Sequence, residues 1–132
     1  MDNKILENKN ILIIEDSLLC MSLIKAFLKG TGVNILTAVT ADEGWNQFNE
    51  NNVDLVITDL RLPGCTGVGL IMRLKQTKPD VPVIVQTASA IDFSEEDCRK
   101  AGCDSFITKP FSKNEFLGII NENIKKSKSS SD

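Results

Sequence analysis

Continuous apolar runs alternate along the chain with stretches in which apolar residues recur every three or four positions. The continuous runs are short and bounded by polar or turn residues, which predicts buried strands, and the recurring pattern predicts amphipathic helices. Strands are expected at 11–14, 33–39, 53–58, 81–86 and 105–108, each followed by a helix. Apolar strands joined by helices predict an α/β fold whose parallel sheet is covered on both faces.

Capping residues mark several helix ends. Ser17 precedes the first helical repeat, and Thr40 and Ser112 each stand three residues before a glutamate, which is the capping-box pattern. Gly102 follows the fourth helix, where a glycine can end it. The segment 62–67 contains the Pro and Gly residues of a turn. The apolar repeat of the first helix consists of Leu19, Leu23, Ile24, Phe27 and Leu28.

The length of 132 residues predicts a single domain. We expect a lead-in at 1–9, the folded domain at 10–126 and a disordered polar tail at 127–132, because the tail is mostly Ser and Lys. The sequence leaves open whether this is a stand-alone protein or part of a longer one.

Charge and composition exclude several classes of function. The 15 basic and 18 acidic residues give a net charge of −3, whereas nucleic-acid binding usually requires a basic excess, so no direct nucleic-acid partner is expected. Histidine is absent, which excludes a His general base, a His metal site and a phosphohistidine carrier within this chain. Any metal must therefore be bound by oxygen or thiolate ligands.

The four cysteines form no C-x-x-C pair, which argues against a zinc ribbon or a thioredoxin-type motif. The apolar runs are far shorter than the roughly 20 residues of a membrane span. No apolar signal run opens the sequence. We therefore expect a cytoplasmic protein with free thiols and no membrane segment in this chain.

Polar side chains stand where the predicted strands end. Glu15 and Asp16 follow the first strand, and Asp59, Thr87 and Lys109 follow three others. Ligands of open parallel sheets bind at the carboxyl ends of the strands, so these side chains are expected on one rim. Clustered carboxylates repel one another, and a hard cation such as Mg²⁺ relieves the repulsion. The alternative is that the acids only interact with the positive ends of the following helices.

Asp59 is a candidate nucleophile because it ends a strand of aliphatic residues. A carboxylate in this position can attack phosphorus and form an acyl phosphate. The transferred phosphoryl group then needs charge neutralisation on its three equatorial oxygens. A metal ion, Lys109 and the Thr87 hydroxyl can each take one of them.

Taken together, four motifs resemble the receiver domain of the two-component response-regulator family, of the chemotaxis-regulator type. They are Ile-Ile-Glu15-Asp16-Ser17, the segment from Asp59 to Gly67, Gln-Thr87-Ala88, and the segment from Ala101 to Phe111. The resemblance extends over about 10–126. It implies the (βα)5 doubly wound, flavodoxin-like fold with a five-stranded parallel sheet in the order 2-1-3-4-5.

The resemblance also implies roles for residues at the rim. Asp59 would be the phosphoacceptor, and Lys109 would contact the phosphoryl oxygens. Asp16 and Asp59 would bind Mg²⁺ directly, or Mn²⁺ in its place. Glu15 would act through water, and the Arg61 backbone carbonyl would be a further ligand. Glu15 stands where many members have Asp, a common variant.

A conformational switch is implied as well. Thr87 would move toward the phosphoryl group and Phe106 would rotate inward behind it. The change would alter the surface of the fourth helix, fifth strand and fifth helix. Phe106 lacks the hydroxyl that a Tyr would offer to a partner. Arg61 and Ser89 would tune dephosphorylation, and the bond between Lys109 and Pro110 is expected to be cis.

The implied partners are a histidine kinase or a histidine phosphotransfer domain as phosphodonor, and a downstream effector protein or domain. A dimer through the fourth-helix to fifth-helix face is possible in this family. The chain would be a signalling phosphoacceptor that assists its own phosphorylation and dephosphorylation, and not a turnover enzyme.

Three alternatives are weighed against this hypothesis. A pseudo-receiver would bind partners without accepting a phosphoryl group. An aspartate-nucleophile phosphatase of the haloacid dehalogenase type needs a second Asp where this chain has Arg61. A flavodoxin-like flavin binder needs a phosphate-binding loop where this chain has Glu15 and Asp16.

Overall fold

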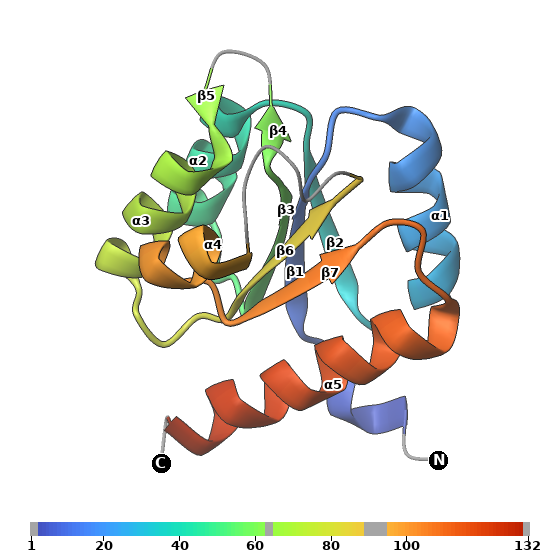
Figure 1. The fold of residues 1–132 in the computed structure, drawn as a ribbon. Coiled ribbons are helices and arrows are strands. Elements are labelled where there is room, and N and C mark those ends of the chain that lie inside the picture. Colours follow the sequence, from blue (N-terminus) through green and yellow to red (C-terminus); the bar gives the residue numbers. More distant parts are fainter. Residues whose placement is uncertain (1–2, 63–64, 89–94, 131–132) are drawn as a thin grey trace.

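Five parallel strands form a sheet in the order β2-β1-β3-β6-β7. The computed structural model describes residues 3–62, 65–88 and 95–130 (Figure 1). The sheet strands are β1 (Asn10–Ile14), β2 (Asn34–Ala38), β3 (Leu55–Asp59), β6 (Val83–Thr87) and β7 (Ser105–Thr108). Counting these strands alone, the order is 2-1-3-4-5, which confirms the predicted doubly wound α/β fold.

Helices cover both faces of this sheet (Figure 1). One face carries α1 (Leu18–Leu28) and α5 (Lys113–Ser130). The other carries α2 (Ala41–Glu50), α3 (Gly67–Thr77) and α4 (Glu95–Ala101). The 3-10 helix η1 (Asn3–Leu6) packs with the first face.

Successive strand residues divide between two cores because side chains alternate across a strand. Ile11 and Ile13 of β1 pack toward α1 and α5, beside Ile57 and Ile84 of the neighbouring strands. Leu12 and Ile14 belong to the core of the opposite face. The central strands β3 and β6 are buried on both faces, which explains why each begins with three consecutive apolar residues.

The predicted caps form at three helices. Ser17 Oγ accepts from the backbone N–H of Cys20 at the start of α1. Thr40 Oγ1 accepts from Glu43 N, although the Glu43 carboxylate reaches back to the N–H of Val39 rather than to that of Thr40. Ser112 and Glu115 form the reciprocal box at α5. Gly102 directly follows α4 with a φ of 114°, a left-handed conformation that favours glycine.

Two segments differ from the sequence expectations. At the expected turn of 62–67, two short strands pair antiparallel that the sequence did not predict, namely β4 (Arg61–Leu62) and β5 (Cys65–Thr66). Helix α5 continues to Ser130, past residue 127, where the polar tail was expected to begin. A helix that is already nucleated gains one hydrogen bond for each residue added, and Lys is a good helix former.

Candidate functional site

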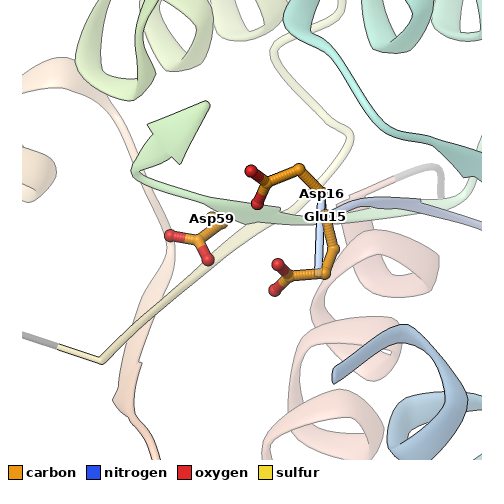
Figure 2. Close-up of side chains that lie close together, drawn as sticks. All are labelled: Glu15, Asp16 and Asp59. Carbon is orange, nitrogen blue, oxygen red and sulfur yellow. The ribbon is translucent and has the colours of Figure 1, made fainter. Parts of the chain in front are cut away.

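Three carboxylates meet at the carboxyl ends of β1 and β3 (Figure 2). Glu15 and Asp16 directly follow β1, and Asp59 is the last residue of β3. One oxygen from each lies within 4.8 Å of the others. Glu15 is 1% exposed and Asp59 is 7% exposed, whereas Asp16 faces solvent. The predicted grouping of these acids is therefore present.

The donor set of this cluster suits a hard divalent cation. All three side chains offer carboxylate oxygens, which are the ligands that Mg²⁺ takes in proteins. Two of the three carboxylates are buried, where their mutual repulsion is poorly screened. A cation at this position would relieve that repulsion.

Lys109 partly compensates the charge of the cluster. Its ammonium lies 2.7 Å from Oε1 of Glu15 and 3.0 Å from Oδ2 of Asp59. Burial alone would lower the pKa of Lys109, but the hydrogen bonds to these carboxylates outweigh it and raise the pKa. Lys109 therefore stays positively charged beside the two acids.

Glu15 is held by three donors. Oε2 accepts from the backbone N–H of Ser17, and Oε1 accepts from Lys109 and from Nε2 of Gln86. Burial nevertheless raises the pKa of Glu15, and the nearby charge of Asp59 adds to the shift. Gln86 appears in the sequence analysis only within the motif around Thr87 and has no role there, although an amide in the run Val83–Thr87 was a visible signal.

The Asp59 carboxylate is oriented from both sides. Oδ1 accepts from the backbone N–H of Arg61 at 3.0 Å, and Oδ2 faces Lys109. The first contact places the Arg61 backbone next to the carboxylates. The metal-binding role of the Arg61 carbonyl stays a prediction.

Thr87 and Phe106 lie on the opposite face of the sheet from Glu15. Thr87 ends β6 and is buried, and its backbone carbonyl accepts from Lys109 N at 2.8 Å. Phe106 pairs in register with Val85, two residues before Thr87, and is partly buried against the core of α2, α3 and α4. The two predicted switch residues are thus near neighbours on adjacent strands. Ser89, the second predicted tuning residue, lies outside the described residues.

The bond between Lys109 and Pro110 is cis, as predicted.

Within the part of the chain that the structure describes, no helix is long and apolar enough to cross a membrane.

The sequence from residue 11 to residue 121 matches the family model of the response regulator receiver domain. The chain belongs to this family. Among curated relatives, the polar-differentiation response regulator DivK of Brucella ovis is 31% identical over 114 residues, which cover 85% of this chain and 93% of DivK. The cell cycle transcriptional regulator CtrA of Caulobacter vibrioides is 29% identical over 118 residues. That match covers 89% of this chain but 51% of CtrA, so the chain spans about half the length of that relative.

Solved structures agree with this assignment. A CheY-like receiver domain protein from Methanospirillum hungatei has a TM-score of 0.86 at 27% identity, covering 94% of this chain and 99% of the other. The receiver domain of the sensor histidine kinase PA1611 from Pseudomonas aeruginosa has a TM-score of 0.81 at 25% identity, covering 89% and 98%. That structure holds a magnesium ion in its active site cleft. The receiver is a signalling domain of two-component systems, and the acidic cluster fits its phosphoacceptor role.

Proposed function

We propose that Asp59 is the residue that accepts the phosphoryl group, from a phosphohistidine of a histidine kinase or a histidine phosphotransfer domain. A carboxylate oxygen of Asp59 attacks phosphorus, a new P–O bond forms, and the P–N bond breaks. The imidazole nitrogen leaves with the electron pair of that bond. The observation that carries the proposal is the double contact of Lys109 with Glu15 and Asp59, because it places a permanent positive charge at the reacting carboxylate.

Glu15, Asp16 and Asp59 would hold Mg²⁺, with the Arg61 backbone carbonyl as a further ligand; Mn²⁺ offers the same chemistry. The bound ion supplies charge neutralisation for the phosphoryl oxygens. Lys109 would contribute its positive charge to the same task. The Lys109 side chain is 15% exposed, and its ammonium can turn from the carboxylates to a phosphoryl oxygen.

Phosphorylation would act on the output surface through Thr87 and Phe106. The Thr87 hydroxyl moves toward the new phosphoryl group, and Phe106 fills the space behind it. Both residues lie on strands next to α4, and β7 is an edge strand of the sheet. The surface formed by α4, β7 and α5 therefore changes for an effector or for a second copy of the chain. Arg61 and Ser89 would set the rate of dephosphorylation, and the cytoplasmic location stays a prediction.

An apolar surface beside the site fits a phosphodonor protein. Leu18 and Leu19 are 78% and 81% exposed, and Leu23 is 45% exposed. A hollow of about 140 Å³ lies between α1 and the segment after β7, lined by Leu19, Cys20, Leu23, Lys109, Pro110 and Phe111. A donor that delivers phosphorus to Asp59 must cover Lys109, so it would bury these leucines as well.

The decisive experiment measures intact mass after incubation with acetyl phosphate, with and without Mg²⁺. We expect one added phosphoryl group that requires Mg²⁺ and is absent in Asp59→Asn. Asp42→Asn, an exposed position in α2, serves as the matched control and should still accept the group.

If no adduct is detected, the chain is next titrated with beryllofluoride, because rapid hydrolysis of the acyl phosphate can hide the product. A chain that neither gains mass nor binds beryllofluoride would be a pseudo-receiver, and the proposal would be wrong. An adduct that persists in Asp59→Asn would move the acceptor to another residue.

A further inference from the structure

Gln86 belongs to a row of side chains that crosses the sheet at the level of the acidic cluster. Asp59 pairs in register with Gln86, and Gln86 pairs with Ile107. Glu15 follows Ile14, whose partner on β3 directly precedes Asp59, so Glu15 continues the row on β1. On β1, β3 and β6 the row two residues earlier holds the buried isoleucines Ile13, Ile57 and Ile84, and Ser105 continues it on β7. An aliphatic residue would therefore suit the packing at position 86.

The Gln86 amide is fully buried and only half satisfied. Nε2 donates to Oε1 of Glu15 at 3.0 Å, and this bond is itself buried. Oε1 of Gln86 has no hydrogen-bond partner among the described residues. A buried carbonyl without a partner costs stability. Packing in the sheet therefore does not explain why an amide side chain stands at position 86, whereas the hydrogen bond to Glu15 does.

Lys109 and Gln86 donate to the same oxygen of Glu15, but they differ in what else they do. Lys109 also contacts Asp59 and, in the function proposed above, turns to the phosphoryl group. Gln86 is anchored in β6 between two strands and is uncharged. It can hold the Glu15 carboxylate without competing for a cation or a phosphoryl group.

We infer that Gln86 is a positioning residue for the metal site, which fixes the Glu15 carboxylate in the orientation that a divalent cation requires. Residues that hydrogen-bond to a metal-binding side chain orient it and tune the affinity. The inference rests on the proposed function, because that function places the cation at Glu15, Asp16 and Asp59.

The test compares Mg²⁺ affinity with stability in Gln86→Met, using isothermal titration calorimetry with Mg²⁺ alone and urea unfolding without divalent ions. We expect the Kd for Mg²⁺ to rise about tenfold, a typical effect of losing such a partner. The urea midpoint should stay equal or rise, because the unpaired carbonyl is removed. A residue with only a structural role would lower the midpoint and leave the Kd unchanged.

Asn123→Leu is the matched control. Asn123 is also a fully buried amide with an unpaired oxygen, but it donates to Ser105 Oγ and to the carbonyl of Ile119, away from the carboxylates. Its substitution should leave the Kd for Mg²⁺ unchanged. An equal rise in Kd in both variants would overturn the inference.

A second measurement uses the unchanged chain and does not depend on how a variant folds. Mg²⁺ titration followed by NMR should shift the side-chain amide signals of Gln86 and not those of Asn123. If the Gln86 amide signals do not shift with Mg²⁺, or if Gln86→Met keeps the original Kd for Mg²⁺, the positioning role is wrong. The proposed metal site would not be affected by either result. A failure of the unchanged chain to bind Mg²⁺ would instead overturn the proposed metal site, and this inference with it.

Discussion

Lys109 and Glu15 form an ion pair of 2.7 Å across a sequence separation of 94 residues. The pair links the end of the first strand to the segment after the last strand of the sheet. Glu15 is almost fully buried, so its charge depends on this contact. Lys109 therefore compensates buried negative charge in the apo protein, and in the proposed function it also contacts the phosphoryl group.

Lys109→Met should lower the free energy of unfolding by about 3 kcal/mol at neutral pH without divalent ions, because two carboxylates lose their cation. The loss should shrink on acidification. Burial already raises the pKa of Glu15 above 4.5, and removal of Lys109 raises it further. The folded variant then keeps a proton on Glu15 at a pH where the unfolded chain has already lost it. The free energy of unfolding of Lys109→Met therefore falls as pH rises through the raised pKa of Glu15, and it recovers as pH falls.

Urea unfolding between pH 5 and pH 8 checks this prediction, with exposed Lys125→Met as the control. A loss in Lys109→Met that is the same at both ends of the pH range would contradict the role assigned to the buried carboxylates.

Leu19→Lys should separate two routes of phosphorylation. Transfer from a phosphorylated histidine phosphotransfer domain should slow about tenfold. The new charge lies in an apolar contact with the donor, and about 1.4 kcal/mol of binding free energy is lost. Phosphorylation by acetyl phosphate should be unchanged, because the small donor does not need the leucine surface. Met72→Lys, an exposed apolar residue of α3, should affect neither rate. Equal slowing with both donors would mean that the substitution disturbs the site itself.

Gly67→Ala should destabilise the protein by about 1–3 kcal/mol through overpacking. A Cβ at Gly67 would lie 2.7 Å from Cα and 2.9 Å from the carbonyl oxygen of Leu60, the residue directly after Asp59. Phosphorylation by acetyl phosphate should slow too, because the backbone beside Asp59 must shift. In Gly118→Ala, where the added Cβ meets nothing within 4 Å, helix propensity should instead raise stability by up to about 1 kcal/mol. Thermal unfolding of the two variants decides between these outcomes.

The cysteines should differ in reactivity. Burial raises the pKa of Cys103 to about 12 and also raises that of Cys98, so both thiols stay protonated near pH 8. Cys20 is half-buried at the hollow beside Lys109. In a Cys65→Ser background, iodoacetamide at pH 8 should modify Cys20 well before the other two, as read by peptide mass. Early labelling of Cys98 or Cys103 in the folded protein would contradict their burial.

The strand pattern and the strand-end residues could be predicted because burial and topology leave a direct trace in the sequence. An apolar run such as 53–58 predicts a central strand. In a parallel sheet the residues that follow the strands lie at the same edge. Glu15, Asp16, Asp59 and Lys109 could thus be grouped before any distance was known. The resemblance to receiver domains supplied the strand order and the individual roles.

Contacts between distant side chains could not be predicted in the same way. The helical spacing of Leu19 and Leu23 is typical of a buried face, yet both side chains are exposed beside the site. The amide of Gln86 is visible in the sequence, but its meaning depends on the register of β6 against β3. The β4–β5 hairpin is too short for a periodic signal.

The position of η1 and of the last turns of α5 has a practical consequence. Both lie at the amino-terminal end of the strands, on the far side of the molecule from the carboxyl ends of β1 and β3 (Figure 1). A fluorescent protein or an affinity tag attached at η1 or at the last turns of α5 would leave the edge that carries Asp59 unobstructed. Energy transfer between fluorophores at η1 and at the last turns of α5 would, however, report poorly on the proposed switch, because neither segment adjoins Thr87. A sensor built on this chain should carry its label on α4.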